Sequence, residues 1–307
     1  MIRNFFLIGL LCFLPSVPVQ AETVVQPLWR SSGAGIISAP ILNEISGLAR
    51  SHWDSKRLWV LNDSGNDAAL YAISTTGELL GTVKIEGAKN RDWESLASFR
   101  LNGKNYLVIG DTGDNLGVHK SCRLYLVEEP RILSAEASLK PVAMTSYTYE
   151  DGPKDVESIA VDTAAKKILL MSKREKVTGL YELPLLLKSP ATPLVAGKTA
   201  SMDSLPQPTE QDRQTNFFMA PYLGQVTDMN LSPDGNSLAV LTYQDVFLYR
   251  RQKGETWAAA ALRAPQVLPR HNLIQAEALC FSMDGQSIFV TSERKISSPL
   301  LRYDLAK

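Results

Sequence analysis

The sequence predicts an all-β protein built as a β-propeller of four-stranded blades, and three observations carry that prediction. Five segments repeat one pattern: an acidic residue, a small or hydroxyl residue, a short apolar strand, a polar turn and a second, very apolar strand. The acidic residues that open these segments lie 50, 63, 71 and 49 residues apart, close to the period of propeller blades. A third strand with a tyrosine follows in each of the five segments, and helical periodicity is nearly absent.

The repeat predicts where each strand lies. The first and second strands of the five units are expected at 44–49 and 58–63, 94–97 and 106–111, 157–162 and 168–173, 228–232 and 238–243, and 277–281 and 288–293. Third strands are expected at 69–73, 123–127, 179–183, 246–249 and 300–303. The Asp-Gly pairs at 234–235 and 284–285 fit tight hairpins between first and second strands, because glycine accepts a positive φ.

Fourth strands are expected at 81–86, 142–149, 198–204 and 257–263. The fifth unit has too few residues left for a fourth strand, so we expect the N-terminal stretch around 23–30 to supply it and close the ring. Five units are countable, and the long gap between the third and fourth units has room for a sixth.

The first 21 residues have the pattern of a signal peptide. Arg3 precedes an apolar run from Phe5 to Leu14, and small residues at Val19 and Ala21 fit a cleavage site near Ala21. An N-terminal membrane anchor and lipidation at Cys12 are the alternatives; the run is short for a membrane span, and the residues before Cys12 fit lipidation poorly. We therefore expect a single propeller domain over 22–307, periplasmic or secreted, with no membrane span in the mature chain.

Composition excludes several classes of protein. The 32 basic and 32 acidic residues balance, so there is no basic surplus of the kind that nucleic-acid-binding proteins carry. No G-x-S-x-G motif and no zinc-like spacing of histidines occurs. Cys122 and Cys280 remain in the mature chain. A disulfide between them is possible in an exported protein, but two free thiols are favoured because Cys280 lies in an apolar run. We expect a monomer.

Propeller geometry places the repeated acidic residues together. First strands line the central channel and second strands run antiparallel beside them, so the starts of the former and the ends of the latter meet at one mouth. The starts are Glu44, Glu94, Glu157, Asp228 and Glu277, and the ends are Asn62-Asp63, Asp111, Lys173-Arg174, Tyr243-Gln244 and Glu293-Arg294. Five like charges facing one axis require a cation, basic neighbours or raised pKa values.

Two interpretations of this mouth stay open. Oxygen-rich carboxylate sites suit a divalent cation, most readily Ca²⁺. The expected metal ligands are Glu44, Asp63, Glu94, Asp111 and Asp114; the expected ligand-binding residues are Asn62, Trp93, Glu157, Asp228, Glu277 and Arg294. Alternatively, each acidic residue caps its own blade by accepting backbone N–H groups. The aromatic ring of Trp93 is either a ligand platform or packing between blades.

The motifs also resemble a known family. E-x-S-G-L-A at 44–49, L-W-V-L-N-D-S-G at 58–65, D-W-E at 92–94, G-D-T-G-D-N at 110–115 and E-E-P at 128–130 resemble the exported phytase-like or esterase-like β-propeller proteins of bacteria. The resemblance covers most of 40–185 and returns at 228–304. It implies a propeller, export and calcium-dependent hydrolysis of phosphoric or carboxylic esters, with Glu44, Asn62, Asp63, Glu94 and Asp111 as counterparts of the residues around a central metal.

The leading hypothesis is a metal-dependent hydrolase of a small ester or phosphoester. Lys173 or Arg174 is expected to be catalytic by stabilising the developing anion. The alternative is a non-catalytic module that binds a protein, peptide or glycan on the same face, because a fold does not fix a function. A third hypothesis is a scaffold in envelope assembly whose acidic ring is purely structural.

Overall fold

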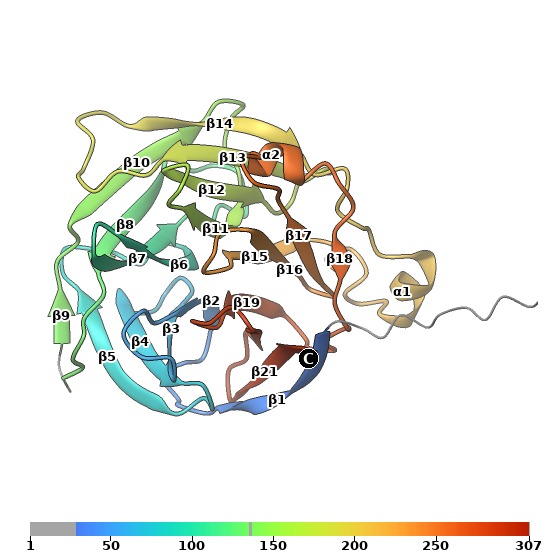
Figure 1. The fold of residues 1–307 in the computed structure, drawn as a ribbon, viewed down its shortest axis with the longest axis horizontal. Helices are drawn as coiled ribbons and strands as arrows, with labels where there is room; N and C mark the ends of the chain where they lie inside the picture. Colours follow the sequence, from blue (N-terminus) through green and yellow to red (C-terminus); the bar gives the residue numbers. More distant parts are fainter. Residues whose placement is uncertain (1–28, 135–136, 307) are drawn as a thin grey trace, which may run out of the picture.

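The computed structural model describes residues 29–134 and 137–306 (Figure 1). Strands dominate this part of the chain, and its helices are the short α1 (Glu210–Thr215) and α2 (Trp257–Ala260). No helix among the described residues is both long enough and apolar enough to span a membrane. The predicted signal peptide at 1–21 lies outside the described residues.

The strands form sheets in which neighbours along the chain usually pair antiparallel. One sheet has the order β2 (Ile45–Arg50), β3 (Arg57–Asn62), β4 (Ala69–Ser74), β5 (Leu79–Ile85) and β9 (Ala137–Leu139). Another has the order β15 (Val226–Leu231), β16 (Ser237–Thr242), β17 (Val246–Arg250) and β18 (Gln266–Val267). A third has the order β19 (Ala276–Phe281), β20 (Ser287–Ser292), β21 (Ser298–Leu305) and β1 (Trp29–Ile37).

The remaining strands form one eight-stranded sheet made of two four-stranded halves. The first half is β6 (Trp93–Leu101), β7 (Lys104–Asp111), β8 (Cys122–Glu128) and β10 (Ala143–Tyr149). The second half is β11 (Val156–Asp162), β12 (Lys167–Ser172), β13 (Gly179–Pro184) and β14 (Leu194–Ser201). The halves join where β10 pairs with β14 in parallel, so this one sheet holds two of the repeated units.

The first strand of each repeated unit lies at the centre of the molecule. β2 packs on β6, β6 on β11, β11 on β15, β15 on β19, and β19 on β2. Figure 1 shows the sheets spreading outward from these strands. Every residue of β2, β11, β15 and β19 is buried. The protein is therefore all-β and propeller-like.

The apolar core lies between neighbouring sheets. One cluster combines β2–β5 with β6–β8 and contains Trp59, Trp93 and Tyr125. Another combines the second-unit strands with the third-unit strands and contains Tyr147, Tyr149 and Tyr181. Three further clusters fill the remaining junctions between adjacent units. A strand that lies between two neighbouring sheets is apolar on both faces, because it packs against one sheet on each side. This explains why the second strands are continuous apolar runs.

The predicted first, second and third strands are confirmed, and one fourth strand was wrong. Residues 257–260 form helix α2, whose N-cap Thr256 accepts a hydrogen bond from the Ala259 N–H. The fourth strand of that unit is instead the two-residue β18. The alanine run 258–261 favours helix, and Thr256 supplies the cap that an isolated short helix needs.

Two other expectations concern the ends and the long gap. The N-terminal strand that pairs with β21 is β1 at Trp29–Ile37, several residues later than the expected 23–30, of which 23–28 lie outside the described residues. Residues 202–225 carry α1 and turns and contain no strand. Cys122 and Cys280 are both buried and free, as the sequence favoured.

Candidate functional site

The site begins with a β-bulge that recurs at the start of every central strand. The register of β2, β6, β11, β15 and β19 against their second strands shifts across one residue, and these residues are Ser46, Glu94, Glu157, Thr227 and Glu277. A bulge re-aims the side chain of its extra residue. The structurally equivalent positions therefore hold three glutamates and two hydroxyl residues.

The two hydroxyl residues tie neighbouring units together. Ser46 Oγ donates to the Trp93 carbonyl at 2.7 Å, and Thr227 Oγ1 donates to the Ala276 carbonyl at 2.7 Å. Each bond reaches from one central strand to the start of the next. The other three bulges hold longer, ionisable glutamates, so this repeated position differs chemically from one unit to the next.

Three carboxylates form a compact cluster at this mouth. One oxygen from each of Asp63, Asp92 and Glu94 lies within 4.8 Å of the other two. Asp63 follows the last paired residue of β3, while Asp92 and Glu94 flank Trp93 at the start of β6. Gly113 completes the cradle, because a Cβ there would lie 2.4 Å from Asp92 Oδ2.

Burial and like charges raise the pKa values of this cluster. Burial raises the pKa of Asp92 to about 6, and the Asp63 and Asp155 carboxylates add to the shift. Glu94 is only 6% exposed, and burial followed by the charge of Glu157 raises its pKa well above the usual value. The pKa of Asp63 is also raised, chiefly by burial. Three ionised carboxylates are therefore unfavourable here without a compensating cation.

Lys173 is the cation that acts on these carboxylates from the far side of the mouth. Its Nζ pairs with Glu157, donates to Tyr243 Oη at 2.9 Å and lies 4.0 Å from Glu277 Oε2. Tyr243 Oη in turn donates to Glu277 Oε1 at 2.7 Å. Burial acts to lower the pKa of Lys173, but Glu157 and Glu277 outweigh it and raise that pKa.

The mouth thus has two halves. Lys173 and Tyr243 bridge Glu157 and Glu277 on one side, whereas Asp63, Asp92 and Glu94 form the cluster on the other. Glu293, the residue after β20, adds a further carboxylate; burial and the charges of Glu277 and Asp63 raise its pKa to about 7.

The cluster fits a hard divalent cation. All donors are carboxylate oxygens, the ligands that Ca²⁺ and Mg²⁺ prefer. The Asn62 side-chain oxygen, one residue before Asp63, is buried and has no hydrogen-bond partner among the described residues. Asn62 is the counterpart of Asp111, however, so its side chain lies on the other face of the strand from the cluster.

Asp92 is the member that the sequence analysis missed. It lies two residues before the bulge, as do Glu44, Asp155, Gln225 and Gln275 in the other units. This second repeated polar position was visible in the sequence, but the comparison of the repeated units treated Glu44 as the equivalent of Glu94. The bulge register shows instead that Glu44 corresponds to Asp92 and Ser46 to Glu94.

Three other predicted metal ligands are engaged elsewhere. Glu44 Oε2 accepts from Asn66 Nδ2 at 2.8 Å. Asp111 accepts from the Asp92 N–H at 3.0 Å and lies 3.6 Å from Arg91 Nε. Its register makes it the counterpart of Asn62 rather than of Asp63, so its side chain falls on the other face of the strand. Asp114 accepts from the Val118 and His119 N–H groups and closes its own loop.

Two predicted ligand-binding residues are structural. Trp93 is fully buried, packs 6.0 Å from Tyr125 and donates from Nε1 to the Lys89 carbonyl, so it is a core residue rather than a ligand platform. Asp228 is fully buried and accepts from the Met229 and Leu279 N–H groups. Asp228 therefore accepts backbone N–H groups, as the blade-capping interpretation expects, but one of them comes from β19 of the next unit, so it links two units.

The remaining predicted residues lie around the mouth. Arg174 donates to Asp155 Oδ2 at 2.6 Å and to Asn115 Oδ1 at 3.0 Å, joining two neighbouring loops. Arg294 is exposed in the turn after β20. Asn62 Nδ2 donates to the Ile41 carbonyl at 2.6 Å, which leaves its oxygen available.

Comparisons with known proteins give no family. No protein-family model and no curated protein matches the chain. Among solved structures, a luciferin-regenerating enzyme resembles this chain at 10% identity and a TM-score of 0.43, covering 89% of this chain and 95% of that one. We base no assignment on a likeness this distant.

Proposed function

We propose that the protein is a closed five-bladed β-propeller of the exported phytase-like or esterase-like kind. The cyclic packing of β2, β6, β11, β15 and β19 supports five blades, and the pairing of β1 with β21 supports closure by the N-terminal strand. Export rests on the signal-peptide pattern before residue 22.

We further propose that the mouth of this propeller binds a divalent cation, Ca²⁺ first, and hydrolyses a small ester or phosphoester. The observation that carries the proposal is the convergence of Asp63, Asp92 and Glu94 within 4.8 Å, opposite Glu157 and Glu277. When bound, such a cation supplies Lewis-acid polarisation of an ester or phosphoryl oxygen and activation of water.

The chain's own residues set the rest of the site. Asp63, Asp92 and Glu94 would hold the cation through their carboxylate oxygens. Lys173 holds Glu157 and Glu277 in place through its ion pair and its hydrogen bond to Tyr243. Both Lys173 and Arg174 are engaged with carboxylates, so stabilising a developing anion requires one of these contacts to open.

The test compares calcium binding in the mature protein and two variants. Asp92→Asn removes one carboxylate of the cluster; Asp67→Asn, on the exposed part of the same loop as Asp63, is the matched control. Calorimetric titration of Ca²⁺ into chelator-treated protein should show one site in the wild type and in Asp67→Asn. The affinity of Asp92→Asn should be at least about tenfold weaker, since even residues that only orient metal ligands change affinity by 10–100-fold.

Activity is measured separately. Aryl esters and aryl phosphates are offered with calcium and with chelator, and we expect turnover that calcium supports and Asp92→Asn abolishes. Calcium binding without turnover of either substrate class would leave the cation site standing but contradict the hydrolase proposal. No calcium binding in the wild type would contradict both.

A further inference from the structure

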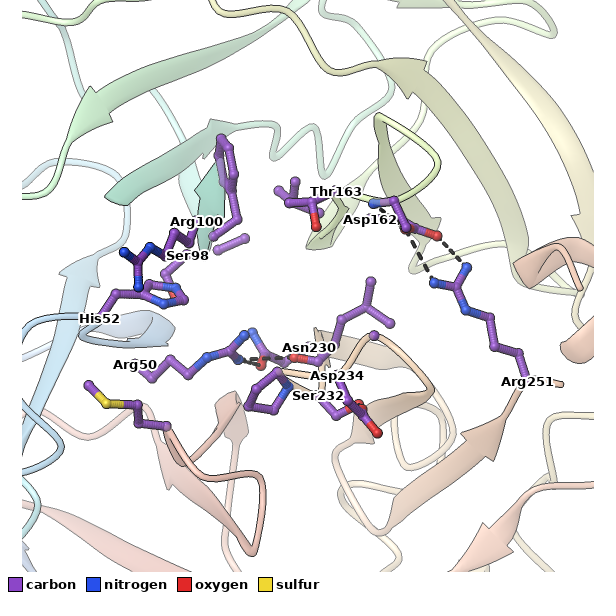
Figure 2. Close-up of a pocket in the computed structure, with 18 residues that line it drawn as sticks. Arg50, His52, Ser98, Arg100, Asp162, Thr163, Asn230, Ser232, Asp234 and Arg251 are labelled. Atoms are coloured by element: carbon purple, nitrogen blue, oxygen red, sulfur yellow. Dashed lines mark hydrogen bonds and ion pairs between the residues drawn. The ribbon is translucent and has the colours of Figure 1, made fainter. Parts of the chain in front are cut away.

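The opposite end of the central strands encloses a second polar cavity. A cavity of about 260 Å³ lies where β2, β6, β11 and β15 end, away from the acidic mouth at their starts. Figure 2 shows Arg50, His52 and Ser98 on one side of it and the Asp162–Arg251 pair on the other. Pro233 and Met283 also line the cavity.

Arg50 is a buried cation that has no carboxylate partner in the described part of the chain. It is only 6% exposed, and its Nη1 donates to two neutral acceptors, Asn230 Oδ1 and the Leu231 carbonyl, each at 3.0 Å. Its Nε is buried without a hydrogen-bond partner. Burial lowers the pKa of Arg50 to about 10, so the guanidinium is still charged at neutral pH. A buried, unpaired charge is costly unless an anion compensates it.

Two further unsatisfied polar atoms line the same cavity. Ser98 Oγ and His52 Nε2 are buried, and neither has a hydrogen-bond partner among the described residues. Burial, and then the charge of Arg50, lower the pKa of His52 to about 4, so its ring is neutral at pH 7 and can donate one N–H. Arg100 adds positive charge at the exposed rim.

The acidic side chains that line the cavity are already engaged. Asp162 pairs with Arg251 and accepts from the Ala164 and Ala165 N–H groups. Asp234 accepts from Ser232 Oγ and from the Asn236 N–H within its own turn. Neither carboxylate compensates Arg50, so the positive charge on that side of the cavity is available to an anionic ligand.

We propose that this cavity is a binding site for a small oxyanion, held by Arg50, Ser98 and His52. The guanidinium Nε–H, a hydroxyl and an imidazole N–H are donors that suit the oxygens of a phosphate, a sulfate or a carboxylate. Asn230 orients Arg50 through its amide oxygen, which also accepts from the Phe281 N–H and so fixes Arg50 relative to β19. The site is independent of the acidic mouth, because it lies at the other ends of the same strands.

The test measures the thermal midpoint of the full mature protein with sodium phosphate, sodium sulfate or sodium acetate against sodium chloride of equal ionic strength. Chelator is present throughout, so that calcium at the acidic mouth does not contribute. At least one oxyanion should raise the midpoint of the wild type in a saturable way, and which one does so identifies the preferred head group. No saturable rise with any of the three would overturn the proposal.

Variants then locate the site. Arg50→Met should abolish the response, and Ser98→Ala, a milder change, should weaken binding by about tenfold or more through loss of one bond to a charged ligand. Arg30→Gln, which removes an exposed arginine on β1, is the charge-matched control and should respond like the wild type. An unchanged response in a folded Ser98→Ala protein would overturn the assignment even if Arg50→Met fails to fold.

Discussion

At the scale of single residues, Lys173 is the cation of the acidic mouth. It pairs with Glu157, lies 4.0 Å from Glu277 and donates a hydrogen bond to Tyr243. The three carboxylates on the other side, at Asp63, Asp92 and Glu94, have no comparable partner among the described ion pairs. The two halves of the mouth therefore differ: one contains a cation, Lys173, and the other contains none among the described residues.

Replacing Lys173 by Met should destabilise the protein by about 3–5 kcal/mol, because it leaves Glu157 buried without its partner. Adding Glu157→Gln to that variant should recover a large part of the loss, since the uncompensated charge is then removed. Urea denaturation of the wild type, both single variants and the double variant gives the coupling. Additive single effects would show that the pair is not energetically linked.

Asp228 should behave differently from the mouth acids. Its two backbone hydrogen bonds hold β15 to β19, so Asp228→Ala should cost about 2–3 kcal/mol by leaving buried N–H groups unsatisfied. Asp228→Asn keeps an acceptor oxygen and should cost less. Calcium binding should be unchanged in both, as measured by calorimetry; a loss of calcium affinity in Asp228→Asn would place this residue in the cation site after all.

At the scale of elements, the N-terminal strand β1 carries the proposed closure of the ring. It pairs with β21 over most of its length, and its Gly35 lies directly against the turn after β4. A Cβ at Gly35 would lie 2.0 Å from the Thr76 carbonyl oxygen, whereas a Cβ at Gly33 would meet nothing within 4 Å. The two glycines, two residues apart on one strand, therefore form a matched pair.

Gly35→Ala should destabilise the protein by about 1–3 kcal/mol, because β1 must move away from the Thr76 carbonyl to admit the methyl group. Gly33→Ala should be neutral or slightly stabilising, since it only restricts the unfolded chain. Thermal unfolding of the two variants distinguishes them. Equal midpoints would show that β1 does not pack against the first unit as described.

The strands could be predicted from the sequence, but the register of their first residues could not. The repeat located the central strands because both of their faces are buried and their apolar runs are unmistakable. It misplaced Asp228 and Asp111 by one residue, and a shift of one residue sends a side chain to the other face. It misplaced Glu44 by two residues, because Glu44 corresponds to Asp92 and not to Glu94. No pattern in the linear sequence marks a bulge, so the equivalence of Ser46 and Thr227 with the glutamates could not be predicted.

Other site residues were hidden for different reasons. Asp92 occupies a polar position that repeats in every unit, but the units were aligned on the nearby Glu94 instead. The proposed oxyanion cavity involves Arg50, His52 and Ser98, which repeat in no other unit; only the fold shows that these residues, each with an unsatisfied buried atom, line one cavity. In the gap at 202–225 the sequence alone left room for a sixth unit, and only the fold shows a helix and turns there.

At the scale of the whole molecule, the acidic mouth should make stability depend on pH. Asp92, with a pKa of about 6, and Glu293, with a pKa of about 7, both have folded-state values above those of the unfolded chain. Between the unfolded-state and folded-state pKa values of these two groups, the folded state therefore binds more protons than the unfolded state. The stability of the metal-free protein should rise as the pH falls from 8 to about 6.

Calcium should reverse this trend, because protons compete with the cation for the same carboxylates. Thermal midpoints measured at pH 8, 7 and 6 with chelator should rise toward pH 6, while the gain from added calcium should shrink over the same range. Asp212 and Glu255, whose pKa values are lowered, oppose the trend only at lower pH. His52 and His271, whose pKa values are lowered to about 4, oppose it in part as the pH falls below about 7, but the buried carboxylates with raised pKa values, which include Glu94 and Glu157, outnumber them. A calcium gain that does not change between pH 8 and 6 would contradict the proposed ligands.

The most direct test of the central claim, that the three carboxylates hold a cation, is anomalous diffraction from crystals grown with Ca²⁺ or Mn²⁺. We predict an anomalous peak bounded by Asp63, Asp92 and Glu94, about 2.3–2.6 Å from their oxygens for Ca²⁺. A map with no peak at this position, in crystals that contain millimolar cation and show the cluster intact, would contradict it.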